Sequence, residues 1–265
     1  MFKKRTIIGF ILIPLALLFL TKTLVDYLFI DKASSTPFFY DECEKVWGHR
    51  GYFKNQEQNS LNSYREAFDL GAKGTELDIY YDIEMNDFVV SHDFPYNLKE
   101  GKLLMLEEVF NAFGNVNYYW LDFKNLKNMS EKDVRSSILR MTSLTDKYKI
   151  KDKIIIESTN VNNLFHLTKA GFNTSYFINF NTGRWYYWIY LYELKIKYIL
   201  GYFSAISMDY RIYTLKLKKS FPGLPVLLFT INEESIVKKY VMDDSVKVIL
   251  SDENLYDSKN NTCTP

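Results

Sequence analysis

Residues 75–93 read TELDIYYDIEMNDFVVSHD, and this stretch decides the fold. Its first part, Thr75–Tyr81, is an apolar strand in which two acidic residues alternate with aliphatic ones. Because side chains alternate across a strand, the carboxylates of Glu76 and Asp78 lie on the same face. If that face is buried, two like charges side by side need a cation to compensate them. The stretch therefore predicts a core strand that carries a cation site.

Strands and helices alternate on both sides of this stretch. The strand-like segments are strongly apolar and are separated by helical spacing, a pattern typical of a parallel sheet covered by helices. Eight such strands match a single (β/α)8 barrel, or TIM barrel, better than an open sheet. The predicted fold is an α/β TIM barrel preceded by an N-terminal transmembrane helix. The predicted strands are residues 45–48, 75–81 with an extension at 88–90, 118–123, 154–156, 175–180, 205–208, 226–231 and 246–250.

Polar or ionisable residues follow nearly every predicted strand. In a TIM barrel the carboxyl ends of the strands meet on one face, where the active site lies. Some of these residues, Ser158, Asn232 and Ser251, also suit a simple helix N-cap. The full set comprises His49, Arg50, Glu76, Asp78, Asp122, Lys124, Glu157, Ser158, Asn179, Asp209, Thr230, Asn232, Ser251 and Asp252.

Two of the three histidines stand at such strand ends. His49 follows the first strand and His92 follows the extension of the second, so the pair brackets the strand with the two carboxylates. Histidines beside a divalent metal are suited to proton transfer. His166 lies inside a helical pattern and is interpreted as a structural residue. The pair therefore predicts acid–base chemistry.

The order of these motifs resembles that of the glycerophosphodiester phosphodiesterase family, within the phosphatidylinositol phospholipase C-like barrels. The resemblance extends from Val46 to Asp252. Its most specific part is the series His-Arg-Gly, Glu-x-Asp and His-Asp. The matching residues are 49–51, 59–60, 67, 71–72, 76–79, 89–93, 106–109, 121–124, 229–232 and 250–252.

This resemblance implies one divalent cation, Ca²⁺ or Mg²⁺, held by hard oxygen ligands. It also implies that two histidines serve as general acid and base, and that two basic residues neutralise the phosphate. The implied cation ligands are Glu76, Asp78 and Asp122, the implied catalytic pair is His49 and His92, and the implied phosphate-binding residues are Arg50 and Lys124.

The chain departs from the family pattern at several positions. Gln58 stands where the family usually has Glu, Asp122 replaces a usual Glu, and Phe229 replaces a usual Trp. About ten residues separate Asp93 from the helix predicted at Leu104, so the insertion that usually follows this motif is nearly absent. A barrel without this cap has an open mouth, which favours a bulky or membrane-embedded substrate.

The N-terminus predicts export. Lys3-Lys4-Arg5 precedes an apolar run, and a basic flank keeps the N-terminus cytoplasmic while the rest is exported. Residues 7–30 suit a membrane anchor, and a cleaved signal peptide is the alternative. The predicted organisation is an anchor over 1–32, a linker over 33–44, the barrel over 45–258 and a tail over 259–265. The barrel is expected on the extracytoplasmic side, periplasmic or extracellular.

The two cysteines, Cys43 and Cys263, flank the predicted barrel. In an oxidising compartment this placement favours a disulfide, with two unrelated thiols as the alternative. The aromatic segment 184–192 is the other unusual feature, because Trp and Tyr clusters suit membrane interfaces. It is interpreted either as a lipid-docking segment at the barrel mouth or as an ordinary barrel helix.

The predicted function is metal-dependent hydrolysis of a glycerophosphodiester or lysophospholipid-type phosphodiester at a membrane surface. A formal net charge of +1 argues against nucleic acid as a partner. The alternatives are a phospholipase D-like or phosphoinositide-type lipid phosphodiesterase and a non-catalytic scaffold that binds a phosphorylated ligand. The retained histidines and acidic pair count against the scaffold, which has no need of buried charges.

Overall fold

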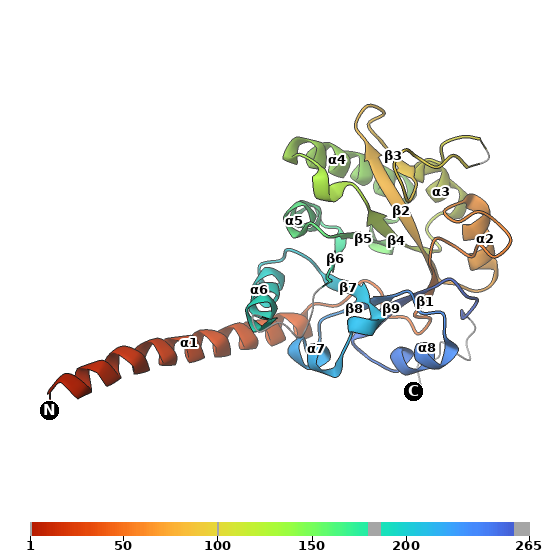
Figure 1. Ribbon diagram of the computed structural model, residues 1–265. Helices are drawn as coiled ribbons and strands as arrows, with labels where there is room; N and C mark the ends of the chain where they lie inside the picture. Colours follow the sequence, from red (N-terminus) through yellow and green to blue (C-terminus); the bar gives the residue numbers. More distant parts are fainter. Residues whose placement is uncertain (1, 100, 180–186, 257–265) are drawn as a thin grey trace.

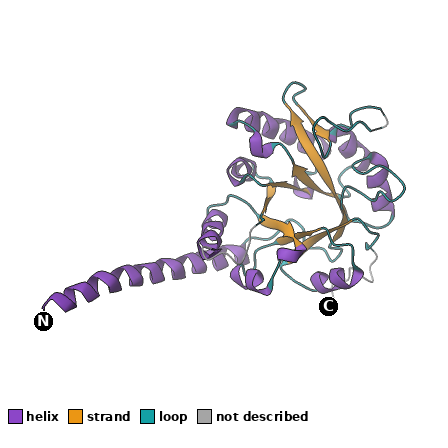
Figure 2. Ribbon diagram, in the orientation of Figure 1, coloured by secondary structure: helices purple, strands orange, loops and turns teal. Residues whose placement is uncertain are grey.

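The computed structural model of the chain describes residues 2–99, 101–179 and 187–256 (Figure 1). In this part, eight parallel strands each pair with their neighbours, and pairing of the first strand with both the second and the last closes the barrel (Figure 2). The predicted TIM barrel is therefore confirmed. The strands are β1 (Val46–Gly48), β2 (Gly74–Asp82), β4 (Tyr118–Phe123), β5 (Ile154–Ser158), β6 (Asn173–Phe177), β7 (Ala205–Asp209), β8 (Val226–Phe229) and β9 (Val246–Ser251).

Strand β3 (Asp87–Val90) lies outside this parallel set. It turns back along β2 as an antiparallel hairpin, with Val90 opposite Ile79. Asn86 in the turn has a φ of +50°, a left-handed conformation that Asn tolerates better than most residues. The hairpin confirms the predicted extension and returns the chain to the level of the acidic residues of β2.

Helices cover the outside of the barrel (Figure 2). Their apolar faces bury residues such as Tyr64 and Leu164 against the strands. Side-chain caps define where several of them begin: in the helix at Leu61, the Ser60 hydroxyl accepts from the Ser63 N–H, and the Ser63 hydroxyl accepts from the Ser60 N–H. These helices are α2 (Leu61–Asp69), α3 (Leu106–Phe113), α4 (Glu131–Tyr148), α5 (Val161–Lys169), α6 (Tyr187–Ile199), α7 (Leu215–Ser220) and α8 (Glu234–Val241).

The interior of the barrel has an aromatic floor at the amino ends of the strands. Tyr40 is 1% exposed, and its ring centre lies 5.0 Å from that of Trp47 and 4.7 Å from that of Tyr118. Its hydroxyl donates to the carbonyl of Glu44 at 2.6 Å, so the buried polar group is satisfied. The segment predicted as a linker, 33–44, therefore contributes a core side chain that closes this end.

Tyr40→Ala is expected to lower the free energy of unfolding by about 3 kcal/mol, because a large buried side chain leaves a cavity in the floor. Urea denaturation of the purified chain measures this difference. Val116→Ala is the matched control, since Val116 is 79% exposed and its loss changes stability by no more than about 0.5 kcal/mol. Equal stability of the two variants would show that the floor does not support the barrel.

Helix α1 (Phe2–Ser35) packs on the barrel through its last turns. Phe29 is fully buried against Tyr198 and Phe221, with ring centres 5.3 and 5.8 Å away. The Lys32 Nζ donates to the carbonyls of Tyr198 and Ile199 at 2.7 and 3.1 Å. The boundary predicted at residue 32 thus falls inside a helix that is joined to the barrel.

The transmembrane helix predicted over residues 7–30 is not identified in the part of the chain that the structure describes. Among the residues described, no helix is both long enough and apolar enough to cross a membrane. The side chains of residues 2–14 are outside the described set.

Two other predictions fall wholly or partly outside the described residues. Cys43 is disulfide-bonded, but its predicted partner Cys263 lies in the tail, which is outside them, so this pairing stays a prediction. Residues 184–186 of the aromatic segment also lie outside, and the rest of that segment begins α6.

Candidate active site

A cleft of about 310 Å³ opens at the carboxyl ends of the strands. It brings together predicted site residues from β1, β2 and β4, which are far apart in the sequence but adjacent in the closed barrel. The walls also include aromatic side chains, whose apolar surface limits water around the charged groups. The lining residues are His49, Arg50, Glu76, Asp78, Trp120, Asp122, Lys124, Glu157, Phe177, Phe229, Thr230 and Leu250.

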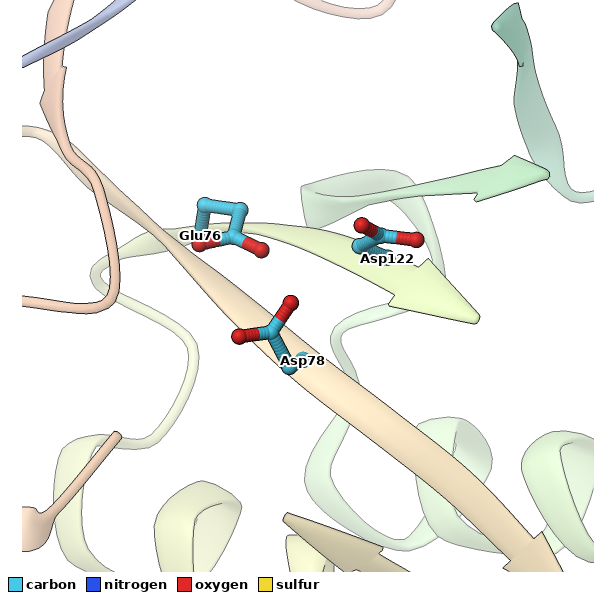
Figure 3. Close-up of side chains that lie close together, drawn as sticks. All are labelled: Glu76, Asp78 and Asp122. Carbon is cyan, nitrogen blue, oxygen red and sulfur yellow. The ribbon is translucent and has the colours of Figure 1, made fainter. Parts of the chain in front are cut away.

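Three carboxylates form the acidic centre of this cleft. One oxygen each from Glu76, Asp78 and Asp122 lies within 4.8 Å of the others (Figure 3). Asp78 and Asp122 are opposite each other in the β2–β4 register, and Glu76 lies two residues earlier on the same face. Close carboxylate oxygens are the donors that Ca²⁺ and Mg²⁺ prefer. The residues present therefore fit the divalent cation that the sequence resemblance implies.

Asp78 is the most enclosed of the three, with no exposed side-chain surface. One of its oxygens lies 2.6 Å from the Lys124 Nζ, and the other lies 3.0 Å from the Arg50 Nε. The Asn59 amide also donates to it at 2.7 Å. Burial alone would raise the pKa of this carboxyl, but Lys124, Arg50 and Asn59 hold it below its ordinary value. The lowered pKa indicates an ionised Asp78 carboxylate at neutral pH.

The two basic residues bind several acidic groups at once. Lys124 also contacts the Asp122 carboxylate, and although burial lowers the pKa of Lys124, the carboxylates around it raise that pKa above the ordinary value. The Arg50 backbone N–H donates to Glu76 at 3.0 Å, and its guanidinium donates to the Gln58 side chain at 3.1 Å. The raised pKa keeps Lys124 charged, and the Arg50 guanidinium lies beside the same group of carboxylates.

Glu157 of β5 adds a fourth acidic side chain that sequence reasoning noted only as a strand-end residue. It lies opposite Asp122 in the strand register and is 5% exposed. One of its oxygens has no hydrogen-bond partner within the described part of the chain. Burial, and then the charge of Asp122, raise the pKa of Glu157 well above its ordinary value.

Glu157→Gln is expected to stabilise the cation-free protein at pH 7 by about 1–2 kcal/mol, because the wild type must either bury a poorly compensated carboxylate or protonate it in order to fold. The raised pKa means that the folded wild type holds its proton to higher pH than the unfolded chain does. The contribution of protonated Glu157 to the free energy of unfolding is therefore fully present at low pH, and it is lost as the pH rises above the ordinary carboxyl pKa.

Urea denaturation in chelator at pH 4.5 and pH 7 should show the advantage of the Glu157→Gln variant growing with pH. Glu84→Gln is the control, since Glu84 is exposed at the β2–β3 turn. If the variant were more stable than the wild type by the same amount at both pH values, the pKa of Glu157 in the folded protein would not be raised.

His49 presents one ring nitrogen to the cleft. Its Nδ1 lies 2.7 Å from a carboxylate oxygen of Asp252, and its Nε2 lies 4.0 Å from an oxygen of Glu76. Burial raises the pKa of Asp252, but hydrogen bonds from His49 and Asn232 hold it below its ordinary value. Because the ionised carboxylate only accepts hydrogen bonds, the proton of neutral His49 is on Nδ1 and Nε2 carries the free lone pair.

His92 lies outside the cleft lining formed by the described residues. Its ring Nδ1 lies 2.9 Å from Asp93, and 38% of its side chain is exposed. The adjacent Ser91 N–H donates to the Asp78 carbonyl at 3.0 Å, so the histidine is held at the rim beside the acidic centre. The two predicted catalytic histidines thus occupy different positions, one in the wall and one on the rim, and their pairing stays a prediction.

Comparisons with known proteins assign a fold family to this geometry. No protein-family profile and no curated protein matches the sequence. The glycerophosphodiester phosphodiesterase from Thermotoga maritima matches with 22% identity over 79% of this chain and 95% of that chain, at a TM-score of 0.60. The chain has the fold of the glycerophosphodiester phosphodiesterases.

Two further solved structures support this assignment. The glycerophosphodiester phosphodiesterase from Parabacteroides distasonis has 19% identity and a TM-score of 0.58, covering 78% of this chain and 92% of that chain. A phosphodiesterase from Oleispira antarctica, in complex with the product sn-glycerol-3-phosphate, has 17% identity and a TM-score of 0.61. It covers 86% of this chain and 97% of that chain.

The residues that depart from the glycerophosphodiester phosphodiesterase pattern can now be located. The Gln58 side-chain carbonyl accepts from the Arg50 guanidinium, which also pairs with Asp78, so the neutral amide adds no further negative charge beside this group. Phe229 lies in an aromatic wall, with its ring centre 5.3 Å from that of Phe177 and 6.2 Å from that of Trp120. Phe229 therefore adds to the apolar wall of the cleft, and Gln58 contacts the arginine that lines its charged part.

Asn59 and Asp252 are site residues whose roles sequence reasoning did not assign. Asn59 donates to Asp78, and its side-chain oxygen accepts from the Tyr64 hydroxyl at 3.0 Å. Its φ of +54°, just before the Ser60 cap, explains why Asn suits this position. The sequence signals for these two residues were the helix start at Asn59-Ser60, the strand-end position of Asp252, and the motif matches at 59–60 and 250–252.

Proposed function

We propose that this chain is a divalent-cation-dependent phosphodiesterase that hydrolyses glycerophosphodiester or lysophospholipid-type substrates. The observation that carries this proposal is the placement of three close carboxylates, two cations and a carboxylate-bound histidine around one cleft. Carboxylates alone would suit a structural ion site. Their combination with Arg50 and Lys124 suits a ligand that is itself anionic, as a phosphodiester is.

Glu76, Asp78 and Asp122 would hold the cation, Ca²⁺ or Mg²⁺. When bound, such an ion supplies positive charge beside the phosphate and so stabilises the charge of the transition state. The guanidinium of Arg50 and the ammonium of Lys124 line the same cleft and contribute further hydrogen-bond donors to the phosphate oxygens.

His49 is the residue best suited to move a proton. Its Nε2 lone pair faces the cleft and accepts a proton from the attacking hydroxyl, either a neighbouring alcohol of the substrate or a water. Asp252 stabilises the imidazolium that results. The bond from phosphorus to the departing alkoxide then breaks, and that alkoxide takes up a proton. The motif resemblance assigns this second transfer to His92.

The cleft and the fold support this class of substrate. The Oleispira antarctica phosphodiesterase, which has the same fold, is described with sn-glycerol-3-phosphate as its product. The cleft of about 310 Å³ has room for a glycerol phosphate unit, and its aromatic wall of Trp120, Phe177 and Phe229 offers apolar surface to the alcohol that leaves.

Phosphorus NMR on purified chain tests this proposal. The chain is incubated with Ca²⁺ or Mg²⁺ and a panel of glycerophosphodiesters, lysophospholipids and phosphoinositides, with His49→Ala as the control. The expected result is a phosphomonoester or cyclic phosphate product in the wild type only. No turnover of any substrate by folded protein would favour the non-catalytic scaffold, and products from intact lipids alone would favour the phospholipase D-like or phosphoinositide-type alternative.

We also propose that the barrel lies on the extracytoplasmic side. This rests on the basic residues Lys3-Lys4-Arg5 before the apolar segment and on the disulfide at Cys43. Alkaline phosphatase fused to the C-terminus reports the location, because that enzyme needs the oxidising compartment. An inactive fusion made at normal levels would contradict export.

A further inference from the structure

Helices α1 and α6 together carry a large exposed apolar surface. Figure 1 shows α1 lying against α6 and extending past it, well beyond the barrel. Between the two helices lies a groove of about 530 Å³ with Leu18, Val25 and Trp188 in its walls. We call the exposed apolar side chains of these helices the α1–α6 surface; its largest contributors are Leu18, Phe19, Leu20, Tyr27, Trp188 and Ile189, each 48–67% exposed.

The exposed side chains lie all around α1, which decides what can cover them. The four consecutive residues 17–20 are each 57–67% exposed, and successive residues of a helix point about 100° apart. A helix that is apolar all round is typically enclosed by the core of a large protein or by a membrane. Because this end of α1 extends beyond the barrel, the barrel's own core does not enclose it. The apolar region of a phospholipid bilayer is therefore the occupant that fits.

Several polar side chains of this part of α1 have hydrogen-bond partners within the protein. Asp26 accepts from the Lys195 Nζ at 2.6 Å and from the Lys22 Nζ at 3.3 Å, and Tyr192 also donates to it. The Thr21 hydroxyl donates to the carbonyl of Leu17 at 2.9 Å. Internal hydrogen bonds of this kind lower the cost of moving Asp26 and Thr21 into an apolar medium.

The contacts between the helices also set the direction of α1. Lys32 binds carbonyls at the end of α6, Asp26 contacts its middle, and Leu18 shares the groove with Trp188 at its start. The two helices therefore run in the same direction. Because a barrel helix starts at the carboxyl end of the preceding strand, the Leu18 end of the pair lies toward the mouth of the cleft.

A contact with α7 supports this direction. The Lys216 Nζ, in the first turn of α7, lies 4.8 Å from the ring centre of Tyr187, the first residue of α6. The starts of both helices thus meet on the mouth side, where Leu215 is 66% exposed.

We propose that the α1–α6 surface docks on a phospholipid bilayer and that this contact turns the mouth of the barrel toward the membrane. The contact stands independently of the chemistry in the cleft. Its consequence for the substrate rests on the proposed function: a diester presented at the bilayer surface would reach the cleft directly.

Fluorescence quenching by vesicles of phosphatidylcholine with brominated acyl chains tests the contact. Trp47 and Trp120 are buried inside the barrel, so Trp188 is the reporter in a full-length Trp185→Phe background. The expected result is strong quenching that disappears in Trp188→Phe. Absence of quenching, or a dimer in sedimentation that does not bind vesicles, would overturn the docking proposal, since a second copy would then cover the surface.

Two added reporters test the orientation in a Trp185→Phe, Trp188→Phe background. Leu215→Trp places a tryptophan on the mouth side, and Val116→Trp places one before β4 at the opposite end; both positions are exposed, at 66% and 79%. Greater quenching at position 215 is expected. Equal quenching, or greater quenching at 116, would overturn the orientation.

Paired substitutions separate this proposal from the proposed function. Leu18→Ser with Trp188→Ser is expected to reduce vesicle partitioning by at least about tenfold and to leave turnover of soluble glycerophosphocholine unchanged. Leu139→Ser is the matched control, because Leu139 on α4 is 72% exposed but lies outside the surface. Loss of partitioning in the control as well would overturn the docking proposal, whereas lack of turnover in every protein, with partitioning intact, would contradict only the phosphodiesterase assignment.

Discussion

His49→Ala is expected to lower phosphodiester turnover by about 10³-fold, because it removes the ring nitrogen that takes the proton from the attacking group. The fold should remain, since His49 lies in the cleft wall and its main partner is the single carboxylate of Asp252. Single-turnover kinetics with a glycerophosphodiester measure the effect, and the far-ultraviolet circular dichroism of the variant checks the fold. More than about a third of wild-type turnover in His49→Ala would exclude His49 from proton transfer.

Asp252→Asn separates positioning from chemistry. The variant keeps the shape of the side chain but no longer selects the tautomer with the proton on Nδ1. We expect a loss of about tenfold to a hundredfold in kcat with little change in KM, together with a shift of the acidic limb of the pH–rate profile. A proportional rise in KM instead would mean that Asp252 acts through substrate binding.

His92→Ala distinguishes a rim role from a catalytic one. If His92 donates the second proton, its loss reduces kcat most for substrates whose departing alkoxide is strongly basic, and least for an activated leaving group such as nitrophenol. An equal loss for both leaving groups would assign the exposed His92 to binding or to support of the rim.

The barrel could be predicted because the spacing of apolar residues along its strands differs from the spacing along its helices. The alternation of Glu76 and Asp78 with Leu77 and Ile79 is enough, from the sequence alone, to predict that both carboxylates lie on one face of the strand. Their approach to Asp122 followed from the order of the strands, since consecutive parallel strands are usually neighbours. This part of the site depends on local pattern and chain order alone.

The contacts that sequence reasoning missed depend on tertiary geometry. Asp252 reaches His49, 203 positions earlier, only because β9 closes the barrel beside β1. Whether His92 faces the cleft or the rim depends on the twist of the β2–β3 hairpin. The last turns of α1 read as part of an anchor because buried Phe29 is as apolar as a lipid-facing residue.

Asp78→Asn is expected to abolish the thermal stabilisation that Ca²⁺ or Mg²⁺ confers on the wild type and to reduce turnover at least about 100-fold. Asp78 is the fully buried member of the triad, within 4.8 Å of the other two carboxylates, so an amide there removes the charge most shielded from water. For the wild type, cation at about 100 times its dissociation constant should stabilise the fold by about 2.7 kcal/mol.

The same substitution should destabilise the cation-free protein by about 3 kcal/mol, because Arg50 and Lys124 lose the anion that pairs with both. Calorimetry with and without cation separates the two effects. The loss of intrinsic stability is the difference between the cation-free variant and the cation-free wild type, and the loss of cation binding is the missing rise in Tm when cation is added to the variant. Glu253→Gln is the control, because that carboxylate pairs with exposed Lys54 away from the triad. If Asp78→Asn kept a cation-dependent rise in Tm equal to that of Glu253→Gln, the ion would have to bind elsewhere, and the triad would be a purely electrostatic partner of the two basic residues.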